Sequence, residues 1–240
     1  MRLYERAILT AGLVIFFVAG YFGVGLTRSP AQAYELTTAL DERVPFIAIS
    51  VWAYLWGFPS ALIPLFVVRC PVLFRRTAIA YGAVIAASLV SFALFPVTSA
   101  HLRVTQAALD VSRPSDWAIA VLYALDPPYN LFPSLHLSIA AVAALAVRKA
   151  AKLYGLPIFL SIALVSVAVC TVKQHCVLDV FGGLGLAALA GSLILRPYRP
   201  VDGSGAAYSW RGPAMYLGLV AVLYASVYLA YLMAFAARPM

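Results

Sequence analysis

Charged residues are scarce in this sequence of 240 residues, because Asp, Glu, Lys and Arg make up only 11% of it and hydrophobic residues make up 64%. A soluble globular domain has about 25% charged residues and is about half apolar. The shortage of charge therefore excludes an ordinary soluble domain. The long apolar runs that are present instead predict an all-α, polytopic membrane helix bundle.

Acidic residues and cysteines are also few. There are 9 Asp and Glu against 17 Lys and Arg, and the basic residues lie mostly between apolar runs. That pattern sets membrane orientation and favours anionic headgroups, so the lipid bilayer is an expected partner and nucleic acid is not. Cys70, Cys170 and Cys176 are odd in number and lack paired spacing, which gives no disulfide framework and leaves the redox compartment undetermined.

A membrane-spanning helix needs about 20 apolar residues, and seven segments are candidates. They are residues 7–26, 45–68, 77–97, 131–147, 155–172, 178–195 and 214–235. Gly57, Pro59 and Pro64 predict a kink or break in the second segment. The connection 98–130 contains a short apolar piece, 117–125, which predicts an interfacial or re-entrant segment. Gly183, Ala187 and Gly191 recur at intervals of four in the sixth segment and predict close helix packing.

The first segment follows two basic residues and precedes Ala31-Gln-Ala33, which mimics a signal-peptidase site. The apolar region of a signal peptide has about 7–15 residues, fewer than the apolar run here. We therefore expect an uncleaved first span, and cleavage is the alternative.

The distribution of Lys and Arg predicts the orientation. Of the 17 basic residues, 11 fall on the side of the N-terminus and 6 fall on the other side. The first group is Arg2, Arg6, Arg69, Arg75, Arg76, Arg148, Lys149, Lys152, Arg196, Arg199 and Arg211; the second is Arg28, Arg43, Arg103, Arg113, Lys173 and Arg238. Because cytoplasmic loops are enriched in Lys and Arg, we expect a cytoplasmic N-terminus and an exterior C-terminus.

Two short polar stretches interrupt the apolar sequence. They are Asp126-Pro-Pro-Tyr-Asn-Leu-Phe-Pro-Ser-Leu-His136 and Lys173-Gln-His-Cys-Val-Leu-Asp179. His175 and Asp179 are four residues apart, so on a helix they share a face and the carboxylate can orient the imidazole. Pro133 breaks regular structure before Ser134 and His136, where an apolar helix begins. In the predicted orientation both stretches face the exterior, which in a bacterial plasma (inner) membrane is the periplasmic side.

These residues suit phosphate-ester chemistry. His175 can attack phosphorus as a nucleophile, and His136 can protonate the leaving oxygen, because imidazole titrates near working pH. The phosphoryl charge must be neutralised by nearby donors. The candidates on this side are Ser134, Lys173, Arg103 and Arg113.

Phe132-Pro-Ser-Leu-His136, followed by Lys173-Gln-His-Cys-Val-Leu-Asp179-Val-Phe-Gly-Gly, resembles the second and third signature motifs of the type 2 phosphatidic acid phosphatase superfamily. The Asp126-Pro-Pro-Tyr-Asn130 lead-in and the Lys-Gln-His form are more similar to its branch with inositol phosphorylceramide synthases. The resemblance covers about residues 7–195 and implies a six-helix catalytic membrane domain within residues 1–195. Residues 196–240 are then a basic connection and a seventh, C-terminal transmembrane helix.

The resemblance implies that His175 forms a phosphohistidine, that Asp179 orients it, that His136 is the general acid and that Ser134 helps to hold phosphate. The first motif of the superfamily is not intact. Arg113-Pro114 resembles its end, but no lysine precedes it at the expected distance, so Arg103 is the substitute.

Two further positions depart from the superfamily. Val169 stands where it has an arginine, whose work Lys173 is expected to do, and Leu135 replaces a glycine.

Simpler interpretations exist for single residues. His101 is expected to be merely solvated, and Asp179 can cap its helix whatever else it does. Lys173, Arg103 and Arg113 can anchor at headgroups. Cys176 adjoins His175, but neighbouring helical residues point about 100° apart and rarely share a metal ion. We expect no metal and no cofactor.

Two outcomes of catalysis remain open. If water resolves the phosphohistidine, the protein is a lipid phosphatase; if an alcohol such as inositol or a sugar hydroxyl does, it is a phosphotransferase. We expect hydrolysis of a membrane lipid phosphate, and transfer is the alternative. A transporter or channel would line its pathway with ionisable residues, of which the apolar spans hold almost none. An assembly protein would not need two histidines and a carboxylate. Neither the lipid nor the oligomeric state follows from the sequence.

Overall fold

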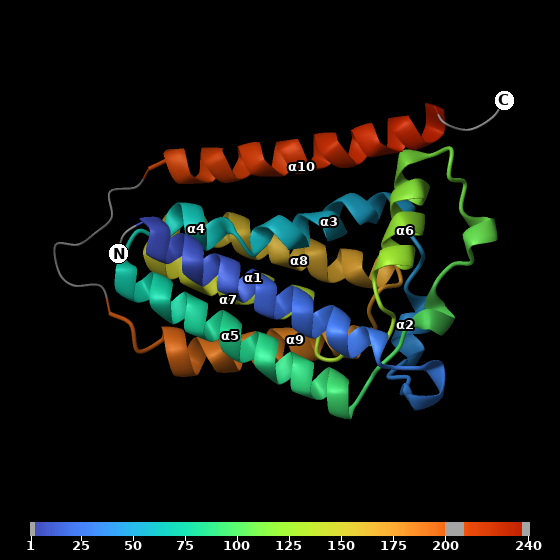
Figure 1. Cartoon of the computed structure of the whole chain (residues 1–240), viewed down its shortest axis with the longest axis horizontal. Coiled ribbons are helices and arrows are strands. Elements are labelled where there is room, and N and C mark those ends of the chain that lie inside the picture. Colours follow the sequence, from blue (N-terminus) through green and yellow to red (C-terminus); the bar gives the residue numbers. More distant parts are fainter. Residues whose placement is uncertain (1–2, 200–208, 237–240) are drawn as a thin grey trace.

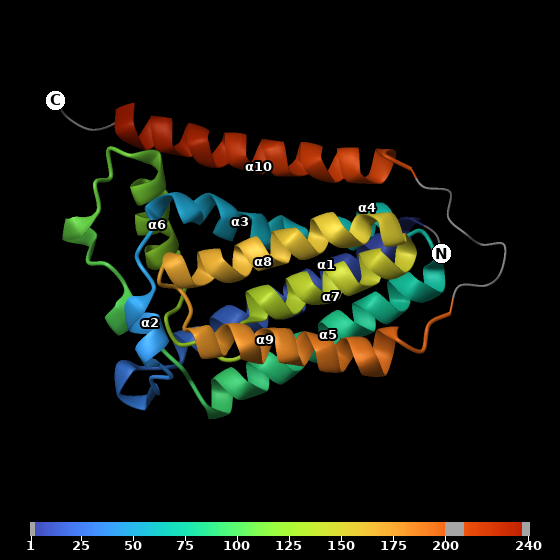
Figure 2. The same cartoon turned by 180° about the vertical axis from the view of Figure 1, so that it is seen from behind.

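The computed structural model describes residues 3–199 and 209–236, which form an all-α bundle without a β-strand. Helices run side by side along one axis, and shorter pieces close one end (Figures 1 and 2). The lengthwise helices are α1 (Leu3–Leu26), α3 (Val51–Ser60), α4 (Ile63–Val67), α5 (Pro71–Leu94), α7 (Leu135–Ala150), α8 (Gly155–Thr171), α9 (Val177–Ala190) and α10 (Arg211–Ala236). The closing pieces include α2 (Ala39–Arg43) and α6 (Pro114–Leu125). Single 3-10 turns occupy Pro30–Gln32, Ala48–Ser50, Ala100–Leu102, Gln106–Ala108 and Lys152–Tyr154, and a π-helical turn, Gly191–Leu195, continues α9.

Within the described residues, five helices are long and apolar enough to cross a membrane. They are Tyr4–Leu26, Pro71–Leu94, Lys152–Thr171, Val177–Leu195 and Arg211–Ala236. The protein is therefore a polytopic membrane bundle, as its composition predicts. The predicted span 131–147 becomes α7, whose 16 residues reach about 24 Å. This is shorter than the roughly 30 Å of a bilayer core, but α7 lies inside the bundle.

The predicted break in the second apolar segment is present. Residues 45–68 form two short helices, α3 and α4, instead of one long helix. Pro59 lies in the last turn of α3, and Pro64 lies at the start of α4. Because proline has no N–H to donate, these positions interrupt the ladder of helical hydrogen bonds.

The short apolar piece predicted to be interfacial is α6. It lies across the end of the bundle (Figure 1). Pro114 occupies its first turn, where a missing N–H has no cost. The indole N–H of Trp52 in α3 donates to the Ser115 hydroxyl at 3.0 Å, and Tyr231 of α10 donates to the Ser112 carbonyl at 2.5 Å. These bonds tie α6 to two lengthwise helices.

Helix α7 is the centre of the bundle and packs against α3, α4, α5, α8 and α9. Its buried face is rich in alanine, which allows neighbours to approach closely. The predicted small-residue face of α9 makes one of these contacts. A Cβ atom at Gly183 would lie 2.5 Å from the Ser134 carbonyl oxygen, and one at Gly191 would lie 2.6 Å from Leu145.

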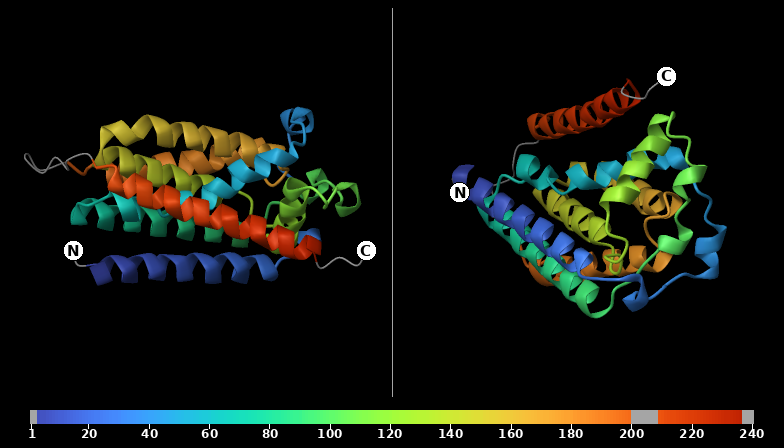
Figure 3. Two further views of the ribbon diagram at one scale, coloured as in Figure 1. Left: turned by 90° about the horizontal axis from the view of Figure 1, so that it is seen from above. Right: turned by 45° about the vertical axis from the view of Figure 1, so that its right-hand side comes forward.

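The turns of the chain fall at two opposite ends of the bundle. The start of α1, the α4–α5 and α7–α8 connections and the end of α9 share one end, whereas α2, α6 and the α8–α9 turn share the other (Figure 1). The described members of the two predicted groups of basic residues are thereby separated; Arg2 and Arg238 lie outside the described residues. Helix α10 runs along α3 and α4 and reaches α6 (Figure 3).

Candidate active site

His175 lies in the turn between α8 and α9. Lys173, at the tip of that turn, has φ 57°, in the left-handed region, so the chain reverses within a few residues. The N–H groups of Gln174 and His175 both donate to the Val169 carbonyl at 3.0 Å. Helix α9 starts directly afterwards and carries Asp179 in its first turn.

His175 is held at both ring nitrogens. Its Nδ1 lies 3.3 Å from Oδ2 of Asp179, and both side chains are buried. The same oxygen accepts the Cys176 N–H at 2.9 Å, so the carboxylate both caps α9 and orients the ring. When Nδ1–H donates to the carboxylate, Nε2 carries the lone pair. Nε2 lies 3.3 Å from the Ser134 hydroxyl oxygen, and this is a suitable geometry for a nucleophilic imidazole.

Ser134 joins the start of α7 to α9. Its N–H donates to the Asp179 carbonyl at 3.0 Å. The Ser138 hydroxyl lies 2.8 Å from the Ser134 carbonyl oxygen and 3.1 Å from that of Gly183. The missing side chain at Gly183 makes this approach possible. The two motif segments therefore form one hydrogen-bonded unit.

His136 lies in the first turn of α7 and contacts α3. Its ring centroid is 6.1 Å from that of His175, 5.0 Å from that of Tyr54 and 4.4 Å from that of Phe58. Its Nε2 is buried and has no hydrogen-bond partner. The structure thus brings the two predicted histidines together and leaves a nitrogen of His136 available for proton transfer.

The predicted basic residues are placed differently. The Lys173 ammonium donates to the carbonyls of Asp41 and Val44, at the end of α2, and is not directed at the histidines. Arg113 is exposed and pairs with Asp110 at 3.1 Å. The structure does not bring these two cations to His175.

Arg103 is nearer to the first polar stretch. Its guanidinium lies 4.8 Å from the centre of the Tyr123 ring, and one terminal nitrogen donates to the Asp126 carbonyl at 3.5 Å. Its Nε is buried without a partner. Of the three predicted cations, Arg103 keeps a donor without a protein acceptor beside the site.

A family model of the PAP2 superfamily matches residues 32–193. The chain belongs to the PAP2 superfamily. This is the type 2 phosphatidic acid phosphatase superfamily that the two motifs resemble, and its members are generally phosphatases or phosphotransferases. Membership supports a phosphatase-type function on lipid phosphates. No curated protein and no solved structure matches the chain.

The PAP2 match includes both motif segments with Ser134, His136, His175 and Asp179. Helices α1 and α10 lie outside it. The match therefore covers both motif segments, and α1 reaches the site from outside the matched residues.

Sequence reasoning missed a buried polar group beside the histidines. Gln174 donates to Oδ2 of Asp126 at 2.9 Å, and Tyr21 of α1 donates to Oδ1 at 2.6 Å. Burial raises the pKa of the Asp126 carboxyl, although the hydrogen bond from Tyr21 partly offsets the rise. Asp126 also interacts electrostatically with His175.

Tyr54 adds a hydroxyl to this group. Its side chain is fully buried, and its hydroxyl interacts with the Gln174 side chain. Asp126 and Gln174 stand inside the two polar stretches, and this position is a sequence signal for them. Tyr54 stands in an apolar segment, and no sequence signal marks it.

His101 and the side chains that could bind a metal ion do not add to the site. His101 is exposed, and its ring nitrogens lie 3.3 Å from a Glu35 carboxylate oxygen and 2.6 Å from the Thr37 hydroxyl. Among residues 3–199 and 209–236, no three His, Cys, Asp or Glu side chains are grouped so that they could hold a metal ion.

Proposed function

We propose that this PAP2 superfamily protein is an integral membrane lipid phosphatase that cleaves a lipid-linked phosphate ester through a phosphohistidine. The observation that carries the proposal is the contact set of His175, with Asp179 at Nδ1 and Ser134 at Nε2. Such an arrangement holds one imidazole tautomer with its lone pair toward the substrate.

In the first step, Nε2 of His175 attacks phosphorus and the bond from phosphorus to the lipid oxygen breaks. Protonated His136 donates its proton to the leaving oxygen, which releases the lipid alcohol. In the second step, His136 takes a proton from water, and the resulting hydroxide attacks phosphorus. The P–N bond breaks, and inorganic phosphate and free His175 result.

Asp179 stabilises the positive charge that develops on His175 during attack. The Ser134 hydroxyl and Arg103 supply donors to the phosphoryl oxygens, and the roles predicted for Lys173 and Arg113 in phosphate binding stay predictions. We expect the protein in the plasma (inner) membrane, where its basic-residue pattern favours a cytoplasmic N-terminus and a site on the exterior or periplasmic side.

The reaction is tested with purified protein in detergent, with EDTA present and a panel of lipid phosphates as substrates. We expect phosphate release that survives chelation and is lost in His175→Ala. The matched control is His101→Ala, which removes an exposed imidazole and should leave turnover unchanged. Release that persists in His175→Ala, or that EDTA abolishes, would contradict the proposal.

The orientation is tested with a thiol reagent that does not cross membranes, in cells whose protein carries one added cysteine on a Cys70→Ser background, in which the remaining Cys170 and Cys176 are buried. The added cysteines are Gln106→Cys and Leu153→Cys, both at exposed positions. Position 106 lies in the connection that leads to α6, and position 153 lies in the α7–α8 connection at the opposite end of the bundle (Figure 1). We expect labelling of intact cells at position 106 alone. Labelling at position 153 alone would show that the protein has the opposite orientation.

A second function is a phosphotransferase similar to inositol phosphorylceramide synthases, which moves a phospho-headgroup to an alcohol. The buried polar group of Tyr54, Gln174 and Asp126 favours it, because these side chains interact with one another beside the histidines and can exchange such contacts for the hydroxyls of an acceptor. Addition of inositol or other polyols to the assay separates the two functions. Transfer that is reduced in Tyr54→Phe while hydrolysis is unchanged would support this second function, and phosphate release alone would oppose it.

A further inference from the structure

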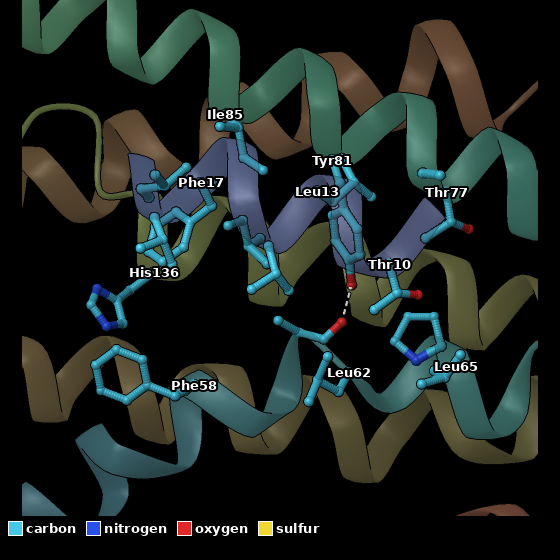
Figure 4. Close-up of a pocket in the computed structure, with 18 of the residues that line it drawn as sticks. Thr10, Leu13, Phe17, Phe58, Leu62, Leu65, Thr77, Tyr81, Ile85 and His136 are labelled. Atoms are coloured by element: carbon cyan, nitrogen blue, oxygen red, sulfur yellow. Dashed lines mark hydrogen bonds between the residues drawn. The ribbon is translucent and has the colours of Figure 1, made fainter. Parts of the chain in front are cut away.

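A cavity of about 270 Å³ adjoins His136 inside the bundle. Its walls come from α1, from α3 and α4, from α5 and from the start of α7 (Figure 4). His136 and Phe58 line one end of the cavity, whereas Thr77 and Leu65 line the other. On α1 the lining runs from Thr10 to Tyr21, eleven residue steps that correspond to about 16 Å along the helix axis. The cavity is therefore elongated along the bundle and ends at the proposed general acid.

The cavity offers almost no free polar group. Most lining side chains are aliphatic or aromatic. The Tyr81 hydroxyl donates to the Ala61 carbonyl and the Thr77 hydroxyl to the Leu73 carbonyl, both at 2.8 Å, so these donors are already used. A buried water needs two to four polar partners, and an apolar cavity stays dry or binds an apolar group. The lining thus selects a hydrocarbon.

One wall of the cavity is loosely attached. Helix α1 packs chiefly against α5, and only 6% of its apolar membrane-spanning stretch is buried. Its first turns are tied to the end of α4 by the Arg6 guanidinium, which donates to the Val68 carbonyl. The other end of α1 is fixed to the site, because Tyr21 donates to Asp126 and accepts from Asn130 at 2.6 Å through its carbonyl. The side between α1 and the α3–α4 pair is therefore the place where the cavity and the bilayer are least separated.

We propose that this cavity binds a single hydrocarbon chain, acyl or prenyl, of the lipid phosphate. The chain passes from the bilayer between α1 and the α3–α4 pair, and its phosphate end lies at His136 and His175. This inference rests on the proposed function, since it assigns the part of the substrate that the catalytic residues do not contact. A volume of 270 Å³ is below the roughly 300–1,000 Å³ of sites that enclose a whole small molecule, so it suits one slender chain. The second chain of a two-chain lipid stays in the bilayer.

The wall supplied by α1 makes the cavity a determinant of chain specificity. The lining side chains of α1, α4 and α5 contact the hydrocarbon chain along its length and not the phosphoryl group, so the shape of these walls selects chain length and branching.

The test is Ala78→Phe in α5, which fills the cavity, with Ala83→Phe in the same helix as the matched control. Ala78 lines the cavity, whereas Ala83 is exposed on the outer surface of α5. Substrates are single-chain acyl phosphates of graded length, prenyl phosphates of graded length, and a short water-soluble phosphate ester. We expect Ala78→Phe to lower kcat/KM for long chains by about tenfold, because displacement of two methylenes costs about that much. Ala78→Phe should cleave the short ester at the wild-type rate. The substrate series, acyl or prenyl, whose kcat/KM depends more steeply on chain length identifies the chain that the cavity binds.

An identical chain-length profile in Ala78→Phe and Ala83→Phe would overturn the inference. If Ala78→Phe does not fold, Ile85→Ala is the second variant, because it enlarges the cavity. It should shift the preferred substrate to longer or bulkier chains. An unchanged chain-length preference would also overturn the inference. A readout without turnover is crosslinking of an alkyl phosphate that bears a photoreactive group near its chain end. Labelled peptides from α1 or α5 support the cavity even if no lipid phosphate is hydrolysed, whereas turnover without such labelling contradicts the cavity and leaves the proposed function standing.

Discussion

The two histidines of the site are set in two different kinds of packing. On the side of His175, α7 and α9 touch through Gly183, and His175 and Ser134 are hydrogen-bonded at the site. On the side of His136, the neighbours are aromatic rings and an apolar cavity, and Nε2 has no partner. Close packing therefore holds the proposed nucleophile, whereas the proposed acid borders the space that a substrate can occupy.

The His175 side depends most on Asp179. In Asp179→Asn the amide still accepts the Cys176 N–H but no longer carries charge or favours the required tautomer. We expect the turnover number to fall on the order of 10⁴-fold, as for other buried aspartate–histidine pairs, with the fold retained. Steady-state kinetics with thermal unfolding of the same sample checks this, and near wild-type turnover would remove Asp179 from the mechanism.

For His136 we expect a smaller loss of turnover, and one that depends on the substrate. A general acid is needed most when the leaving group is a poor one, so His136→Ala should slow cleavage of an alkyl phosphate by about 10²-fold. Cleavage of an aryl phosphate with an acidic leaving group should be nearly unaffected. Equal losses for both substrates, measured as kcat, would assign His136 to binding instead of proton donation.

Two glycines of α9 test the packing itself. A Cβ at Gly183 would lie 2.5 Å from the Ser134 carbonyl oxygen, whereas one at Gly185 would meet nothing within 4 Å. We expect Gly183→Ala to lower the free energy of unfolding by about 1–3 kcal/mol through overpacking, with reduced turnover. Gly185→Ala should be neutral or slightly stabilising, because alanine favours helix. Equal unfolding temperatures in detergent would show that the α7–α9 contact is not tight.

The smallest effect concerns Asp126, which lies between the two sides. Because burial raises its pKa in the folded protein, the stability that Asp126 confers is fully present below the ordinary aspartate pKa of about 3.9 and is lost as pH rises through the raised value. Wild type should therefore lose stability relative to Asp126→Asn as pH increases from about 4. Unfolding temperatures across pH check this, with Glu42→Gln, an exposed carboxylate, as the control; parallel curves for wild type and Asp126→Asn would contradict it.

The sequence predicts those features of the fold that depend on the length and position of apolar segments. The all-α membrane bundle, the break at Pro59 and Pro64 and the crosswise α6 all follow from local composition. The helix boundaries predicted from the sequence are less accurate. Helix α5 begins at Pro71 instead of residue 77, because proline is tolerated in the first turn and the arginines that follow can extend to the interface.

The site is predictable only where its residues lie close together in the sequence. The four-residue spacing of His175 and Asp179 predicts their contact, although His175 precedes the first residue of α9 and is not on the helix itself. The positions of Lys173 on α2 and of Tyr54 beside His136 depend on how distant segments pack, which no local pattern encodes. The cavity likewise arises from five separate helices and leaves no sequence signal.

The central claim, that His175 becomes phosphorylated, is tested most directly by trapping. The protein is mixed with a lipid phosphate labelled in its phosphoryl group and quenched within one turnover, and the modified peptide is identified by mass spectrometry. The account predicts a phosphate on His175 that is labile in acid and stable in alkali, absent from His175→Ala and present in His101→Ala. A phosphate on Ser134 that is stable in acid, or turnover without any labelled protein, would contradict it.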